Sequence, residues 1–458
     1  MPDTPLIVYS PSPSPRLEYA FRVLLGVIHP MSFRLTHSIS EFARFEGARI
    51  SYSPHAVLPP GEALWLPSGS LLFNREIKPL VPALCSPGEL AQWGLPAWPA
   101  LFPLPVSREA EFPFDLPSMC FYLLSRYEEY LPFAPDRFGR FSSGQSQLSQ
   151  LNLLEYPLVD FWATVLKNKL QARWPGLPFQ NRSYRFLPTY DIDVAWAFRH
   201  RPLWRHVLAS ARDVVSGNWE NLAARMQALA GKEPDPYDVY GFLDQEHQKR
   251  GLTPEYFFLV GNYGAYDTNL HHENKAFQGL IRDLSRQGPV GLHPSMASND
   301  KQGRLEEEKR RLERITGTAV SHARQHYLKF RLPETYRRLL QAGITKEYSM
   351  GFADAPGFRA GTCGAFPWYD LPAEQETALW VQPLHVMDGA LKNYLRLPAK
   401  EAIEKAVLLA NRCKQVDGTF CSLWHNSSLS EREGWEGWKQ GYLDLLDEAG
   451  SAPPGKQE

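Results

Sequence analysis

The stretch LPTYDID, residues 187–193, is the starting point for predicting the fold of the second half of the chain. It ends a short apolar run, YRFLPTY, and places the carboxylates of Asp191 and Asp193 one residue apart, where a strand should end. Two carboxylates this close repel each other, so both stay ionised only beside a positive partner. Without such a partner the two aspartates are solvated turn or cap residues of the segment that follows, a role that Asp commonly takes.

Apolar segments like this one recur along the chain and alternate with helical patterns, such as RLEEEKRRLERITG at residues 304–317. Strands that alternate with helices predict a parallel α/β fold. Seven strands spread over roughly 260 residues favour a distorted (β/α) barrel rather than an open sheet. The predicted strands are residues 184–190, 254–260, 289–293, 318–324, 344–350, 378–386 and 419–425.

A proline- and glycine-containing segment, WPGLPFQNRS at residues 174–183, is the best candidate for a linker between domains. It separates a predicted N-terminal α+β domain, residues 1–178, from the predicted barrel, residues 184–446. The N-terminal part contains three helical patterns but no catalytic constellation. Its charged and aromatic stretches, such as DRFGRF, are typical of solvated loops and helix faces.

The composition excludes several classes of protein. The chain has 458 residues, a formal net charge of -1 and 43% hydrophobic residues, so it predicts a large buried core and no basic surface for nucleic acid. Its five cysteines are scattered and form no CxxC motif, which indicates reduced thiols. Neither a secretory signal nor a membrane-spanning stretch is recognisable, so we expect a cytoplasmic protein.

Polar side chains with metal-binding or catalytic chemistry follow several of the predicted strands. In a parallel barrel all strands end on one face, so these residues should converge on a single pocket. An aspartate with two histidines is a suitable ligand set for a divalent ion such as zinc. The strand-end residues are Asp191, Asp193, His293, Arg324, His326, Asp388 and His425.

Each of these residues also has a purely structural interpretation. His293 precedes proline and serine and fits a loop that begins a helix, and His425 fits a core or interface position beside Trp424. Arg324 could be one half of a structural ion pair. The prediction of a site therefore depends on the coincidence of these residues at strand ends and not on any one of them.

The motifs TYDID, VGLHPS, HARQHYLK and LWHNSS occur in an order that resembles the polysaccharide deacetylases of carbohydrate esterase family 4, the NodB-homology superfamily. The resemblance covers about residues 185 to 430 and implies a (β/α) barrel that binds a divalent ion, with zinc the expected metal. The family usually has TFDDG as its first motif, so the insertion of Ile192 between the two acids is a departure. The segment FDLPSMCFYLLSRYEEYLPFAPDRFGRFS, residues 114–142, resembles an N-terminal domain of unknown function found in a divergent bacterial branch of this superfamily.

The resemblance implies a role for each matching residue. Asp191 corresponds to the general base and Asp193 to a metal ligand. His293 corresponds to the first of two metal-binding histidines, but position 297, where the second belongs, is Ala297. We therefore expect His326, which follows the third motif, to replace the missing ligand.

The remaining roles come from the third and last motifs of the family. Arg324 matches the arginine that holds the base, and His425 in LWH matches the histidine that acts as general acid. Arg359 in the branch signature GFRAGT is a candidate substrate contact, and a structural ion pair is its alternative role. Asp388 and Trp424 are further candidate substrate contacts.

Together these roles predict a metal-dependent hydrolase that removes N-acetyl groups from an amino-sugar-containing glycan or glycan precursor. Three alternatives stay open at this point. One is a glycoside hydrolase, whose paired carboxylates would need to flank a sugar bond. The others are a non-catalytic glycan-binding or assembly protein on the same fold and a metal-dependent hydrolase of another amide or ester.

Overall fold

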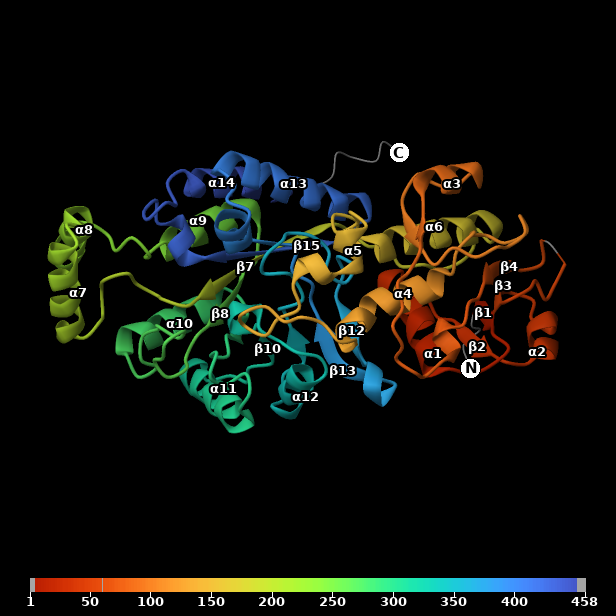
Figure 1. Cartoon of the computed structure of the whole chain (residues 1–458), viewed down its shortest axis with the longest axis horizontal. Coiled ribbons are helices and arrows are strands. Elements are labelled where there is room, and N and C mark those ends of the chain that lie inside the picture. Colours follow the sequence, from red (N-terminus) through yellow and green to blue (C-terminus); the bar gives the residue numbers. More distant parts are fainter. Residues whose placement is uncertain (1–4, 60, 451–458) are drawn as a thin grey trace.

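The structure is a computed structural model that describes residues 5–59 and 61–450, so the first four residues of the predicted N-terminal domain lie outside the described residues. A small sheet occupies one end of the elongated molecule and a large sheet occupies its middle (Figure 1). The other end is formed by two helices, α7 (Leu203–Val215) and α8 (Trp219–Leu229).

The first part of the chain forms a four-stranded parallel sheet in the order β2-β1-β3-β4. All four residues of β1 are buried, as expected for a parallel strand covered on both faces. The strands are β1 (Leu6–Tyr9), β2 (Arg34–Thr36), β3 (Ala48–Ser53) and β4 (Leu64–Pro67), with a separate pair β5 (Leu84–Cys85) and β6 (Ala100–Leu101). The helices are α1 (Pro15–Arg22), α2 (Ile39–Arg44), α3 (Pro87–Gln92), α4 (Leu116–Leu124), α5 (Gln147–Gln150) and α6 (Leu158–Arg173).

The large sheet has nine strands in the order β12-β13-β11-β10-β9-β8-β7-β15-β14, and every neighbouring pair except β12–β13 is parallel. No pairing between its end strands, β12 and β14, is found within residues 5–59 and 61–450, so closure into a barrel stays a prediction. The strands are β7 (Arg185–Ile192), β8 (Glu255–Phe258), β9 (Val290–Leu292), β10 (His322–Ala323), β11 (Lys346–Glu347), β12 (Phe366–Asp370), β13 (Gln375–Val381), β14 (Val386–Met387) and β15 (Thr419–His425).

Helices surround this sheet, and most lie where the sequence predicts them. Gly317 ends one of them with φ 75, as expected for a glycine terminator. The predicted strand at residues 378–386 was wrong as a single element, because it is divided between β13 and β14 at opposite sides of the sheet. The remaining helices are α9 (Tyr240–Arg250), α10 (Lys275–Gln287), α11 (Gln302–Thr316), α12 (Glu334–Gln341), α13 (Ala399–Gln415) and α14 (Trp438–Gly450).

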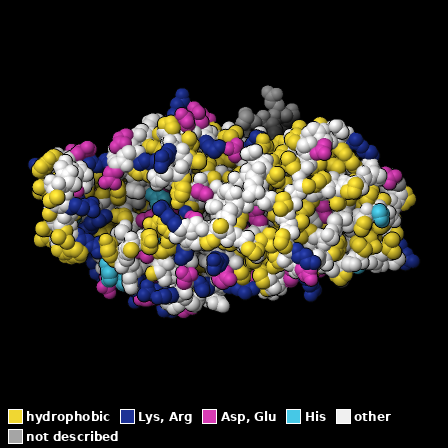
Figure 2. Space-filling view, in the orientation of Figure 1, with side chains coloured by type: hydrophobic (Ala, Val, Ile, Leu, Met, Phe, Trp, Pro, Cys, Tyr) yellow, Lys and Arg dark blue, Asp and Glu magenta, His cyan; other side chains and the backbone are white. Residues whose placement is uncertain are grey.

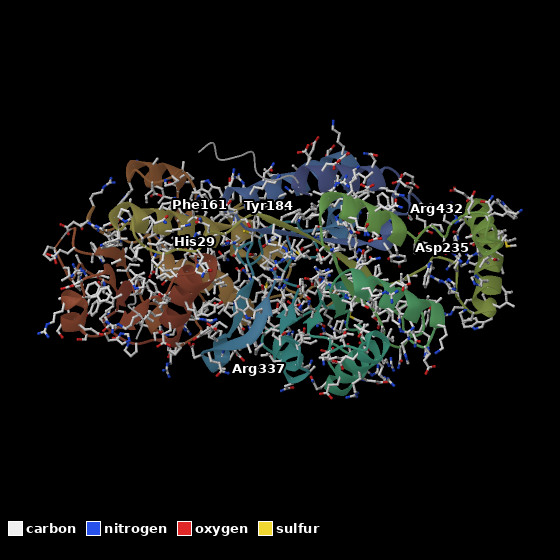
Figure 3. All side chains as sticks on the ribbon, turned by 180° about the vertical axis from the view of Figure 1, so that it is seen from behind. His29, Phe161, Tyr184, Asp235, Arg337 and Arg432 are labelled. Atoms are coloured by element: carbon white, nitrogen blue, oxygen red, sulfur yellow. The ribbon has the colours of Figure 1, made fainter. Side chains whose placement is uncertain are left out.

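The two parts of the chain are joined by buried polar contacts as well as by apolar packing. The carboxylate of Glu129 accepts hydrogen bonds from Arg359 Nε and Nη2 at 2.9 and 2.6 Å. Tyr19 donates to the carbonyl of Pro367 at 2.8 Å. Figure 3 shows His29 and Tyr184 near this junction, where side chains from both parts pack together. The N-terminal part is therefore firmly attached to the large sheet.

The surface of the molecule is mixed in character. No helix within the described ranges is both long enough and apolar enough to cross a membrane. Hydrophobic side chains are nevertheless prominent over the end formed by α7 and α8 (Figure 2).

Candidate metal centre and active site

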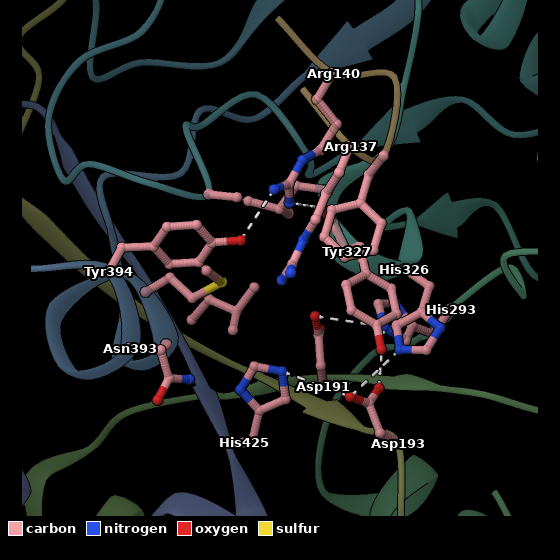
Figure 4. A pocket seen from close by; sticks show the side chains of 16 residues that line it. Arg137, Arg140, Asp191, Asp193, His293, His326, Tyr327, Asn393, Tyr394 and His425 are labelled. Atoms are coloured by element: carbon pink, nitrogen blue, oxygen red, sulfur yellow. Dashed lines mark hydrogen bonds and ion pairs between the residues drawn. The ribbon is translucent and has the colours of Figure 1, made fainter. Parts of the chain in front are cut away.

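The carboxyl ends of the parallel strands surround a cavity of about 470 Å³ (Figure 4). This volume lies within the roughly 300–1,000 Å³ that is typical of small-molecule sites. Asp191 and Asp193 come from the end of β7, His293 directly follows β9, and His425 ends β15. His326 lies three residues after β10. Residues spread over more than 230 positions therefore meet at one edge of the sheet.

Asp191 is held by an arginine from another strand. Arg324 is fully buried, and its Nη1 donates to Asp191 Oδ1 at 2.9 Å. Its other nitrogens donate to Thr189 Oγ1 at 2.7 Å and to the carbonyl of Tyr348 at 3.1 Å. These contacts fix the guanidinium and supply the positive charge that the paired aspartates require.

Asp193, His293 and His326 form a compact group. One ligand atom from each lies within 4.8 Å of the others. His293 Nε2 is 3.1 Å from Asp193 Oδ1, and His326 Nε2 is 3.5 Å from Asp193 Oδ2. His326, which we expect to replace the missing second histidine, thus lies in the same group as His293, the first histidine of the motif.

The outer nitrogens of both imidazoles are occupied by hydrogen-bond acceptors. His293 Nδ1 donates to the carbonyl of Arg324 at 2.6 Å, and His326 Nδ1 donates to Asp267 Oδ1 at 2.9 Å. A carbonyl and a carboxylate can only accept, so both Nδ1 atoms carry the proton. Each Nε2 is thereby directed towards Asp193, an arrangement typical of metal-binding histidines.

Two buried polar atoms of this group lack a hydrogen-bond partner within the described ranges and could both bind a cation. Neither His293 Nε2 nor Asp193 Oδ1 has a well-aligned hydrogen-bond partner among the residues that the structure describes. With the proton of His293 on Nδ1, these two atoms are facing acceptors. A divalent ion between them would satisfy both, and one Asp with two His is a fitting donor set.

The pKa values of these side chains also indicate a position that favours a cation. Burial raises the pKa of Asp193, but His326 and His293 lower it, and the net pKa lies well below the usual value. Burial lowers the pKa of His326, whereas Asp193 and Asp267 raise it, to about 9 overall. The carboxylates therefore favour positive charge at the position where the three side chains meet.

His425 faces the same cavity and is oriented by a buried aspartate. Its Nδ1 lies 2.9 Å from Asp388 Oδ1, and its backbone N–H donates to Asp388 Oδ2 at 2.7 Å. Burial lowers the pKa of His425, and the neighbouring Asp388 outweighs it, which raises the pKa to about 10. His425 Nε2 lies 3.7 Å from Asp193 Oδ2, so a protonated imidazole stands beside the candidate metal ligands.

Asp388 and Trp424 do not sit where a substrate contact requires them. Asp388 is fully buried behind His425, and it also accepts hydrogen bonds from Ser428 and the backbone of Gly389. Trp424 has no exposed surface and packs against Tyr442 of α14. For Trp424 the physical reason is register, because alternate residues of β15 point away from the cavity into the layer of helices.

Arg359 is likewise buried, and its guanidinium is occupied. Besides Glu129, it donates to the carbonyl of Gly351 at 2.8 Å and lies over the rings of Phe330 and Phe352. Of its two predicted roles, the geometry matches the structural ion pair.

The N-terminal part contributes residues to the cavity that the sequence alone did not single out. Arg140 donates to the carbonyl of Tyr327 at 2.7 Å and to the hydroxyl of Tyr394 at 3.0 Å. The ring of Phe138 stacks on Tyr327 with centroids 5.0 Å apart. Arg137 extends its guanidinium into the cavity (Figure 4). The DRFGRF stretch, which resembles an ordinary charged loop, thus forms one wall of the site.

A model of a family of unknown function (DUF7033) matches residues 6–175, close to the predicted N-terminal domain. A search of curated proteins gives no match.

Several solved structures are similar to this chain at low identity. A candidate polysaccharide deacetylase from Mycobacterium smegmatis is 11% identical, with a TM-score of 0.39, over 59% of this chain and 85% of that one. The polysaccharide deacetylase Bc1974 from Bacillus cereus is 12% identical, with a TM-score of 0.29, over 61% and 95% of the two chains. BA3943 from Bacillus anthracis, a pseudoenzyme of carbohydrate esterase family 4, is 13% identical, with a TM-score of 0.29, over 58% and 62%.

Proposed function

We propose that this chain is a metal-dependent hydrolase that removes N-acetyl groups from an amino-sugar-containing glycan or glycan precursor. The observation that carries the proposal is the meeting of Asp193, His293 and His326 beside two further pairs, Arg324 with Asp191 and Asp388 with His425. Metal-assisted hydrolysis of an amide requires ligands for the ion, a general base and a general acid. The cavity offers three candidate ligands, a carboxylate that Arg324 orients and an imidazole that Asp388 orients.

A divalent ion at this position, zinc in our proposal, would lower the pKa of a bound water and polarise the amide carbonyl. Asp191 accepts the proton of the attacking water, and Arg324 orients its carboxylate. His425 donates its Nε2 proton to the departing amine as the C–N bond breaks. The products are acetate and a free amino sugar.

The walls of the cavity support a sugar as the substrate. Phe138, Tyr327 and Tyr394 line it, and aromatic faces pack well against the apolar faces of sugar rings. Arg137 has no hydrogen bond or ion pair within the described part of the chain and reaches into the cavity. We assign to Arg137 the binding of an anionic or oxygen-rich group on the substrate.

A glycoside hydrolase fits these positions less well. Asp191 Oδ2 and Asp193 Oδ1 both approach the same nitrogen, His293 Nε2, at 3.6 and 3.1 Å. A glycosidic bond and its catalytic water need separate carboxylates on either side. The two aspartates instead face one position, which we assign to the metal ion.

The test combines metal content with acetate release. Protein purified without chelators should contain about one divalent ion per chain and should release acetate from N-acetylglucosamine oligomers. A chelator should stop the release, and added zinc should restore it. His326→Ala should lose both the metal and the activity, whereas His271→Ala, at an exposed histidine outside the cavity, should lose neither.

Two results would contradict the proposal. Wild-type protein that binds no metal would remove the basis for hydrolysis and favour a glycan-binding protein. Metal-loaded protein that cleaves other amides or esters but not N-acetylated sugars would place the chain among hydrolases of another substrate.

A further inference from the structure

The helical hairpin of α7 and α8 exposes an unusual amount of apolar surface. Nineteen large hydrophobic side chains are exposed in the described part of the chain, and nine of them fall within residues 203–229. Val215 is 89% exposed, and the two tryptophans, Trp204 and Trp219, are about 60% exposed. The others in this hairpin are Leu203, Val207, Leu208, Val214, Met226 and Leu229.

These side chains form continuous stripes and are not scattered. In α7 the exposed apolar residues recur at intervals of four and seven, from Leu203 through Val207 to Val214, with Trp204, Leu208 and Val215 alongside. At 3.6 residues per turn, they occupy one side of the helix. Such a stripe normally faces a protein core, but here it faces outwards, over the end of the molecule (Figure 2).

The inner side of the hairpin is already packed, so the exposed stripe is not an unfinished core. Phe198 packs with Ala224 and Ala228. The buried carboxylate of Asp213 accepts hydrogen bonds from Arg225 at 2.7 Å and from Asn221 at 3.1 Å. The two helices therefore hold each other through small and polar residues, which leaves the large apolar side chains on the outside.

The hairpin is also anchored to the rest of the molecule. Asp235, which Figure 3 shows near the base of the hairpin, is buried and accepts backbone hydrogen bonds from Ala197, Phe198 and Arg199 at 2.8–2.9 Å. The backbone that enters α7 is thereby fixed to the segment that leaves α8. The apolar face is thus presented in a defined orientation.

The hairpin carries positive charge in an otherwise balanced chain. Residues 203–229 contain three Arg against one Asp and one Glu, and Arg199, Arg201 and Lys232 flank them, whereas the whole chain has a formal net charge of -1. Arg212 is exposed, next to the edge of the apolar stripe. Arg205 lies over Trp204 and over Tyr263, with its guanidinium 5.2 and 4.0 Å from the two ring centroids.

We propose that the α7–α8 hairpin docks on an anionic lipid bilayer, with its apolar side chains in the interfacial layer and its basic residues against the headgroups. An outward apolar face with tryptophan, flanked by Arg and Lys, is the pattern of helices that lie in a membrane interface. Tryptophan favours that position because its ring is apolar and its N–H is polar. A second copy of the chain is a poorer occupant, because it would bring two positively charged hairpins together.

The test is co-sedimentation of the full chain with vesicles of phosphatidylcholine, with or without phosphatidylglycerol. We expect binding to the anionic vesicles, weakening as salt is added, and little binding to the neutral ones. Leu208→Glu with Val215→Glu should abolish binding. Arg212→Glu with Lys232→Glu should weaken it at least tenfold, since each lost basic residue is worth about fivefold.

Matched controls separate docking from general effects of charge. Val81→Glu changes a valine of the N-terminal part that is 73% exposed, and Lys400→Glu changes an exposed lysine at the start of α13. Both should bind anionic vesicles like wild type. All variants should keep the wild-type melting temperature and metal content, because the substituted side chains are on the surface.

The proposal fails if the wild-type protein does not bind anionic vesicles at low salt, or if the hairpin variants bind them as well as the controls do. It also fails if the wild-type chain is a dimer without lipid and Leu208→Glu makes it a monomer, because the apolar face would then be a contact between copies.

Discussion

Arg324 Nη1 donates to Asp191 Oδ1 across 2.9 Å, although their strands, β10 and β7, are separated in the sheet by β9 and β8. In a flat sheet, three strand spacings of about 4.8 Å would lie between them. The long arginine side chain therefore reaches across the ends of β9 and β8 to the carboxylate. This contact links two strand ends that are 133 residues apart.

From this relationship we predict the effect of Asp191→Asn. The amide keeps the shape of the side chain but cannot accept a proton. We expect acetate release to fall by about 10²–10⁴, the usual contribution of a general base. Metal content should stay at the wild-type level, because Asp193, His293 and His326 are unchanged. The measurements are kcat on N-acetylglucosamine oligomers and elemental analysis of the same samples; full activity in this variant would show that Asp191 is not the base.

Much of this site was accessible from the sequence because strands carry a strong local signal. The apolar runs that end at Asp191, His293 and His425 identify strand ends, and parallel strands must end on one side. Asp193, His293 and His326 lie together in the structure. Their roles in binding metal stay a prediction.

Other parts of the site cannot be predicted from the sequence pattern around them. Asp267 lies in an irregular loop, and only the fold brings it within 2.9 Å of His326. Arg137 belongs to the N-terminal part, and its approach to the cavity depends on how the two parts pack. The division between β13 and β14 was missed because one apolar run, ALWVQPLHV, contains the end of β13 and the start of β14 with Pro383 between them. Contacts between distant segments decide all three features.

For Arg137 we predict a change in substrate binding rather than in chemistry. Arg137→Ala should raise KM by about ten- to a hundredfold, the effect of losing a charged hydrogen bond of about 1.5–3 kcal/mol. Its kcat, metal content and melting temperature should change little, because the guanidinium makes no hydrogen bond or ion pair within the described residues and contacts only the ring of Phe138, 4.7 Å from its centroid. Arg137→Lys should recover part of the loss. Arg44→Ala, at an exposed arginine on α2, is the control; a fall in kcat with unchanged KM would contradict the assignment.

For Arg359 we predict a loss of stability. Arg359→Ala leaves Glu129 buried without one of its two arginine partners, the other being Arg126 at 2.7 Å. Breaking a buried ion pair typically costs about 3–5 kcal/mol in the free energy of unfolding. Arg286→Ala, which breaks an exposed pair with Asp283, should cost only about 0–1 kcal/mol. Urea denaturation measures both, and an unchanged stability with a raised KM would restore the prediction that Arg359 contacts the substrate.

The last prediction concerns stability in acid and depends on histidines outside the site. Burial lowers the pKa of His385 to about 4 and that of His29 to about 3, against 6.5 for an ordinary histidine. Both are neutral in the folded chain, so the unfolded chain binds more protons below pH 6.5. The stabilising effect is therefore complete above about pH 6.5 and is lost as the pH falls towards 4.

The variant His385→Asn tests this linkage at one position. His385 Nδ1 accepts a hydrogen bond from the backbone N–H of Cys421 at 2.9 Å, and an asparagine oxygen can accept the same bond. Between pH 7 and pH 5 the wild-type chain should lose stability faster than the variant, by about 1–2 kcal/mol. Urea denaturation at each pH gives this difference. Parallel stability curves for the two proteins would mean that His385 takes up its proton equally in both states, and the assigned pKa would be wrong.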